Sequence, residues 1–135
     1  LRPGALEGRT LKDALEKMIR EYQTLSNLQV DLHYEWVDVD MDVMIEDTIF
    51  RVIQESMTNA VRHGHASQMS LHFFEDEEDY LIELQDNGVG FETLTYGYGL
   101  KQMMERISIL GGQLQFESRD GFFTRVSLPK YKEGR

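Results

Sequence analysis

Cysteine is absent from this chain of 135 residues. The absence excludes a disulfide framework and any metal site built from thiolates, and it is consistent with a reducing cytoplasm. Long apolar runs are also absent, since no stretch approaches the roughly 20 residues of a membrane-spanning helix. Repeats, low-complexity segments and linkers are missing too. We therefore expect one globular domain with one core.

Positive charge is scarce: 14 Lys and Arg residues stand against 24 Asp and Glu residues, for a formal net charge of −10. A field of this sign repels phosphate backbones, so we expect no direct binding of nucleic acid. Much of the acid lies in two runs, residues 38–42 and 75–79, which are typical of turns or solvated faces. Any anionic ligand must be held by local backbone donors or by a cation.

Apolar residues at helical spacing predict three helices, at residues 10–27, 43–63 and 99–110. Thr10 is a suitable N-cap for the first. The second has the most continuous apolar stripe and ends at His63 and the glycine after it.

Alternation of apolar and polar residues predicts five strands, at residues 30–36, 68–75, 79–86, 114–118 and 124–128. Asp120-Gly121 is the expected turn of the last hairpin. The order α-β-α-β-β-α-β-β predicts an α/β fold in two layers, with a mixed sheet of about five strands and three helices on one face.

The second helix carries polar residues opposite its apolar stripe. At 100° per residue, Glu55, Asn59 and Arg62 fall within about 60° of one another. A carboxylate and a carboxamide one turn apart can ligate Mg²⁺, directly or through water, and the carboxylate could also act as a base. An ordinary solvated face is the alternative that this pattern alone leaves open.

Two glycine motifs follow. The strand ending at Asp86 is followed by Gly88 and Gly90, where a backbone without Cβ atoms could approach a flat ligand while the acid accepts a hydrogen bond from an amine such as that of adenine. Residues 97–101, Gly-Tyr-Gly-Leu-Lys, open the third helix, where free N–H groups and Lys101 could hold phosphates. A plain turn and a flexible loop are the respective alternatives.

Taken together, these motifs resemble the Bergerat-fold ATPases, which include gyrase, the large heat-shock chaperone, histidine kinases and MutL. The matching segments are residues 54–63 for the N box, 86–90 for the G1 box, 97–100 for the G2 box and 121–124 for the last shared strand. Further segments resemble the histidine kinases that pair with LuxR/NarL-type response regulators, at residues 51–55, 104–107 and 110–112.

The resemblance implies a role for each matching residue. Asp86 would bind the adenine amino group, Asn59 would coordinate Mg²⁺, and Glu55 would be the general base or a second organiser of the metal. The other residues expected to contact ATP are Arg62, His63, Gly88, Gly90, Gly97, Tyr98, Gly99, Leu100, Lys101 and Thr124. The lid between the two glycine boxes, residues 91–96, is short, which argues against a gyrase-like or chaperone-like protein and implies weak affinity with easy exchange.

Residues 1–3 resemble the junction that follows the dimerisation helices of these kinases, and the chain does not begin with Met. We therefore expect a piece of a longer protein, in which residues 1–9 are a remnant of that junction, 10–131 the ATPase domain and 132–135 a tail. None of His33, His63, His65 and His72 lies in a phosphoacceptor motif of this family, so the acceptor histidine is expected on a separate domain.

The resemblance implies that the domain binds ATP and Mg²⁺ and transfers the γ-phosphoryl group to a histidine of its own dimerisation domain, for relay to a LuxR/NarL-type response regulator. It also implies a homodimeric full-length protein, a monomeric isolated domain and a cytoplasmic location for this domain, with membrane anchoring of the parent left open. Two alternatives share the fold: a stand-alone anti-sigma-factor serine kinase, and a non-catalytic interaction module gated by nucleotide.

Overall fold

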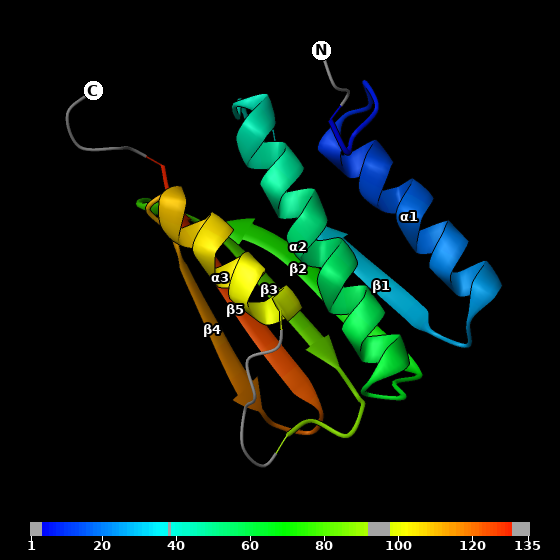
Figure 1. The fold of residues 1–135 in the computed structure, drawn as a ribbon. Coiled ribbons are helices and arrows are strands. Elements are labelled where there is room, and N and C mark those ends of the chain that lie inside the picture. The colour runs from blue at the N-terminus through cyan, green and yellow to red at the C-terminus, as the bar shows by residue number, and fades with distance from the viewer. Residues whose placement is uncertain (1–3, 38, 92–97, 131–135) are drawn as a thin grey trace.

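The computed structural model describes residues 4–37, 39–91 and 98–130, the side chain of Tyr98 excepted. The chain forms three helices and five strands in the predicted order (Figure 1). Their bounds are α1 Leu11–Leu25, β1 Gln29–Tyr34, α2 Val43–Arg62, β2 Gln68–Glu75, β3 Asp79–Asp86, α3 Tyr98–Ile109, β4 Gln113–Ser118 and β5 Phe122–Pro129.

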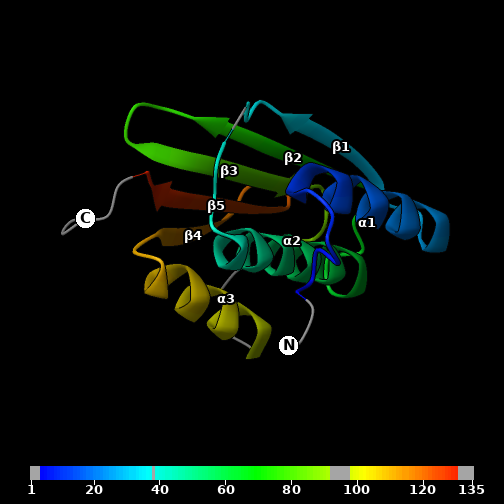
Figure 2. The same cartoon turned by 90° about the horizontal axis from the view of Figure 1, so that it is seen from above.

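The five strands form one mixed sheet in the order β1-β2-β3-β5-β4. β1 and β2 are parallel because α2 crosses over between them, and the other three pairs are antiparallel. All three helices lie on the same face of the sheet (Figure 2). The predicted fold class, a two-layer α/β sandwich, is confirmed.

Apolar residues between the helices and the sheet form the core, and α2 contributes the most central ones. Ile53 and Met57 of α2 are fully buried, as are Leu71 of β2 and Ile82 of β3. Burial of side chains of this size contributes roughly 1.5–3 kcal/mol each. Because the apolar face of α2 is buried in the core, only its polar face remains available to contact a ligand.

The ends of α1 and α2 follow from local hydrogen bonds. The hydroxyl of Thr10 accepts the Asp13 N–H at 3.1 Å, as expected for the predicted N-cap. Asp42 caps α2 in the same way, by accepting the Met44 N–H at 2.7 Å. The hydroxyls of Tyr22 and Thr58 lie 2.6 Å apart and join α1 to one side of α2.

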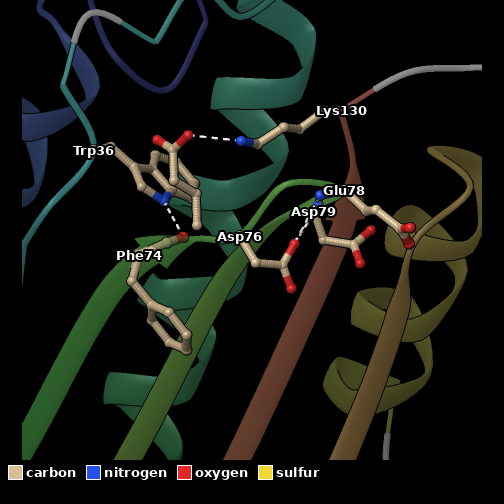
Figure 3. A network of polar contacts seen from close by, with 7 residues as sticks. Trp36, Phe74, Asp76, Glu78, Asp79 and Lys130 are labelled. Carbon is tan, nitrogen blue, oxygen red and sulfur yellow. Dashed lines mark hydrogen bonds and ion pairs between the residues drawn. The ribbon is translucent and has the colours of Figure 1, made fainter.

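The acidic run at residues 75–79 forms the turn between β2 and β3, as predicted. The Asp76 carboxylate accepts the N–H groups of Glu78 and Asp79 at 2.9 and 2.7 Å (Figure 3). These two bonds hold the pKa of Asp76 below its usual value. Lys130 pairs with Glu75 at 2.7 Å beside the turn. The run is thus accounted for by local structure.

The first predicted strand is wrong at its end, because β1 stops at Tyr34 rather than at Trp36. Trp36 is nevertheless buried, and its indole N–H donates to the Phe74 carbonyl at 2.6 Å (Figure 3). The ring packs edge-on against Phe73. The alternation persists past the strand because Trp36 enters the core from a segment that has already left the sheet.

Among the described residues, no helix combines the length and the apolarity that a bilayer crossing requires.

Candidate functional site

Asp86 lies at the end of β3 and is 6% exposed. One carboxylate oxygen, Oδ1, accepts two backbone hydrogen bonds, from Gly88 at 2.8 Å and from Phe122 at 3.0 Å. No described residue donates to the other oxygen, Oδ2. A buried carboxylate held by its first oxygen offers the second to a donor on a ligand, and charge-assisted bonds of this kind are among the strong ones.

The glycines after Asp86 pack against protein backbone. A Cβ at Gly88 would lie 2.6 Å from the Gly64 carbonyl oxygen, and a Cβ at Gly90, whose φ is +65°, would lie 2.6 Å from that of Gly121. Gly121 has a φ of +131°, and a Cβ there would lie 2.0 Å from the Asp86 carbonyl oxygen. The turn after β3 is therefore fixed between the end of α2 and the β4–β5 turn. The sequence motif did not reveal the contribution of Gly64 and Gly121.

Thr124 belongs to the same wall of the site as Asp86. It lies on β5 opposite Leu84 of β3, two residues before Asp86 along that strand. Thr124 is 3% exposed and Leu84 is 1% exposed. Because side chains alternate along a strand, Thr124, Leu84 and Asp86 share the helix-covered face of the sheet. The structure thus brings the predicted Thr124 and Asp86 together.

The other predicted site residues lie on the polar side of α2. Glu55 and Asn59 are half-buried and lie one helical turn apart. The Glu55 carboxylate rests against Gly99 in the first turn of α3, where an added Cβ would lie 1.6 Å from Oε1. Gly99 therefore lets the start of α3 approach Glu55, which agrees with the prediction that these two residues share a site.

Hard oxygen atoms of Glu55 and Asn59 are suitable ligands for Mg²⁺. Within the described ranges, no group of three His, Cys, Asp or Glu side chains is arranged to hold a metal ion. The chain thus offers two oxygen ligands rather than a closed cage. That set fits Mg²⁺, which commonly completes its shell with phosphate oxygens and water.

The other residues predicted to contact ATP lie in different surroundings. Arg62, His63 and Lys101 are exposed, whereas Leu100 packs against the core. Gly97 and the side chain of Tyr98 lie outside the described residues, as does the predicted lid beyond Phe91. Phe91 itself donates its N–H to the Ser118 hydroxyl at 3.0 Å.

A groove between α2 and α3 begins at Glu55 and has a volume of about 240 Å³. It is lined by Arg51, Val52, Gln54, Glu55, Gly99, Gln102, Met103 and Arg106. Arg51 donates to Asp47 at 3.1 Å. Partial burial by itself would raise the pKa of Asp47, but hydrogen bonds from the Ala5 backbone and Arg51, with the charges of Arg51 and Arg106, hold it below its usual value.

In the sequence, Arg51 and Arg106 lie in segments that resemble the histidine kinases, and neither is predicted to belong to the site. Their meeting in the groove depends on the packing of α2 against α3, which spacing along one helix does not reveal.

Comparison with known proteins shows to which family the chain belongs. Residues 44–132 match the model of the family described as "Histidine kinase-, DNA gyrase B-, and HSP90-like ATPase". Over 96% of its length, the chain is 34% identical to the signal transduction histidine-protein kinase/phosphatase UhpB of Salmonella typhimurium, of which it covers 27%. Over 95% of its length, it is 30% identical to the sensor histidine kinase LiaS of Bacillus subtilis, of which it covers 36%. The chain thus spans about a quarter to a third of these relatives.

Solved structures give the same fold. The histidine kinase AdeS of Acinetobacter baumannii superposes with a TM-score of 0.77 at 20% identity, over 90% of this chain and 65% of that one. The histidine kinase domain of the blue-light activated kinase of Erythrobacter litoralis gives 0.75 at 17% identity, over 96% of this chain and 64% of that one. With the family match over residues 44–132, we conclude that the chain belongs to the histidine kinase-, DNA gyrase B- and HSP90-like ATPases.

Proposed function

We propose that this domain binds ATP with Mg²⁺ and transfers the γ-phosphoryl group to a histidine on the dimerisation domain of the same sensor kinase. The single observation that carries the proposal is the buried Asp86, which gives Oδ1 to two backbone N–H groups and keeps Oδ2 for a ligand. The adenine amino group is a donor of the right kind for that oxygen. Thr124 would complete the adenine side of the site.

The path of the triphosphate follows from this placement. Asp86 lies near the C-terminal end of α2, because the turn after it packs on Gly64. From there the phosphates would extend back along α2, past Asn59 to Glu55, with Gly99 and the start of α3 opposite. Asn59 and Glu55 would hold Mg²⁺ between them and the phosphates, and the ion would neutralise charge during transfer.

The acceptor would enter from the groove beyond Glu55. A ring nitrogen of a neutral imidazole attacks the γ-phosphorus, the bond to the bridging oxygen breaks, and ADP leaves. The phosphorylated ring then loses the proton on its other nitrogen. Glu55 is the carboxylate at that end of the path and would accept this proton. Arg51 and Arg106 in the groove could stabilise the transferring phosphoryl group or the incoming segment.

Relay to an aspartate of a LuxR/NarL-type response regulator and dimerisation through the dimerisation domain complete the proposed function. Within it, residues 10–131 are the ATPase domain and residues 1–9 continue from the dimerisation helices. A serine kinase for an anti-sigma system or a non-catalytic module would share the fold. Similarity to sensor histidine kinases over 95% or more of the chain favours the histidine kinase.

The proposed function predicts labelling in trans. Incubated alone with γ-labelled ATP, the chain should accumulate no acid-labile phosphohistidine. A separately supplied dimerisation domain bearing the acceptor histidine should become labelled slowly, because the tether that raises the effective concentration is missing. Glu55→Ala should reduce this labelling at least tenfold. It should reduce ATP affinity much less, because Asn59, the phosphates and water would still hold the ion.

Glu16→Ala on α1 is the matched control, because Glu16 is half-buried like Glu55 and lies outside the proposed site. This variant should label the acceptor domain as the unmodified chain does. Stable phosphorylation of the chain itself on His63 or His65 would contradict the proposal, as would a wild-type chain that binds ATP and never labels the acceptor domain.

A further inference from the structure

Three polar side chains are buried in the described part of the chain: Ser56, Asp86 and Thr124. Asp86 and Thr124 already belong to the proposed nucleotide site. Ser56 on α2 is 8% exposed, and its hydroxyl is the one buried side-chain polar atom there without a hydrogen-bond partner. A buried hydroxyl without a partner is destabilising, and in native proteins such groups are few.

The contacts of α2 indicate where Ser56 points. Thr58 contacts α1 through Tyr22, and Ser56 lies about 160° around the helix from Thr58. Val52, one turn before Ser56, faces Met103 of α3 across the groove. Asn59 lies about 60° around the helix from Ser56. Ser56 therefore lies on the α3 side of α2, between the polar side of that helix and the core.

The position of Ser56 along α2 also brings it to the level of Thr124 and Leu84 in the sheet. α2 and β3 run the same way (Figure 1). Gly88, just after β3, packs on Gly64, just after α2. Ser56 lies about 12 Å before Gly64 at the helical rise of 1.5 Å per residue. Thr124 and Leu84 likewise lie before Asp86 along the sheet, by about 7 Å. Ser56 is thus placed over the part of the sheet that carries the two other buried polar groups.

We propose that the Ser56 hydroxyl donates a hydrogen bond to a ring nitrogen of adenine, directly or through one water. This inference rests on the proposed nucleotide site. The adenine amino group is flanked by ring nitrogens that are acceptors only, and the Asp86 carboxylate cannot donate to them. A serine hydroxyl can, and its own unsatisfied state ends when the base binds.

Two opposite effects of one substitution follow. Ser56→Ala removes the unpartnered hydroxyl, so the nucleotide-free chain should become more stable. The same change removes a donor from the bound state, so ATP affinity should fall roughly three- to tenfold, the effect of one hydrogen bond between neutral groups. If Ser56 merely fills the core, Ser56→Ala should change the melting temperature and leave ATP affinity unchanged, and that result would overturn the assignment.

Ser108→Ala is the matched control, because Ser108 lies exposed on α3. It reports the gain that alanine brings by helix propensity alone. Ser56→Ala should raise the melting temperature of the nucleotide-free chain by more than Ser108→Ala does, and only Ser56→Ala should weaken ATP binding. A lower melting temperature for Ser56→Ala would overturn the assignment.

Nucleotide analogues locate the bond. 1-Deaza-ATP and 7-deaza-ATP each replace one ring nitrogen by a C–H group. The unmodified chain should bind one of them more weakly than ATP, and Ser56→Ala should bind that analogue and ATP equally. Unchanged discrimination against both analogues in Ser56→Ala overturns the role of Ser56, whereas absence of ATP binding by the unmodified chain contradicts the proposed function itself.

Discussion

Asp86 gives one carboxylate oxygen to the protein backbone and leaves the other for the proposed ligand. Oδ1 fixes the turn after β3 and the start of β5 through Gly88 and Phe122, and this bonding also fixes the direction of Oδ2. One residue therefore shapes the backbone of the site and presents the group that would distinguish one base from another. Replacement of Asp86 by the isosteric asparagine distinguishes its role in the backbone from its role toward the base.

Asp86→Asn is expected to keep the fold and lose the nucleotide. The amide oxygen can still accept from Gly88 and Phe122, so the melting temperature should change little. The amide N–H₂ would then face the adenine amino group, donor against donor, and ATP affinity should fall by roughly 2–3 kcal/mol, about 30- to 150-fold.

Calorimetric titration of ATP measures that loss, and Asp31→Asn on the exposed face of β1 is the control for removal of one negative charge. ATP binding by Asp86→Asn as tight as that of Asp31→Asn would show that Asp86 has no part in reading the base.

At the scale of elements, the site depends on three close approaches of backbone. The turn after β3 meets the end of α2 at Gly64, the β4–β5 turn meets Asp86 at Gly121, and the start of α3 meets Glu55 at Gly99. Each contact joins segments far apart in the sequence. The position of the glycine motifs is thus set by how the elements pack.

Gly121→Ala should destabilise the chain more than a positive φ alone explains. Gly8 also has a positive φ, +79°, but nothing lies within 4 Å of a Cβ there. Gly8→Ala should cost about 1 kcal/mol, since an L residue is strained at such a φ. Gly121→Ala adds an overlap with the Asp86 carbonyl and should cost about 3 kcal/mol, with ATP binding weakened as well.

Urea unfolding of the two variants measures the difference. Equal losses of unfolding free energy in Gly8→Ala and Gly121→Ala would mean that the β4–β5 turn can move away from Asp86 without cost. That result would contradict the tight packing of Gly121 on the Asp86 carbonyl.

The sequence predicted these elements well and their mutual contacts poorly. Apolar stripes with caps placed α2 to within one residue at its end, and alternation placed β2 and β3. The alternation predicted a strand as far as Trp36, which is too long, because burial continues past the last hydrogen-bonded residue of β1. The contact of Gly99 with Glu55 and the burial of Ser56 without a partner depend on how α2 and α3 pack, and spacing along one helix carries no information about either.

At the scale of the whole molecule, charge limits how this domain can hold ATP. The net charge of −10 repels a triphosphate at long range, so affinity must come from local donors and from the cation that we propose at Glu55 and Asn59. Selectivity must then come from the base, because the phosphates of all nucleoside triphosphates are alike. Among the described residues, Asp86 is the only buried charged side chain, and it is therefore the group best placed to supply that selectivity.

Titration of the unmodified chain with ATP and with GTP, each with Mg²⁺, tests the role of Asp86 in the nucleotide site most directly. Guanine presents a carbonyl oxygen where adenine presents its amino group, so GTP would leave the buried Asp86 carboxylate facing an acceptor. We predict binding of ATP at least about tenfold tighter than that of GTP. Equal affinity for the two nucleotides, or no binding of ATP, would contradict the assignment of the site.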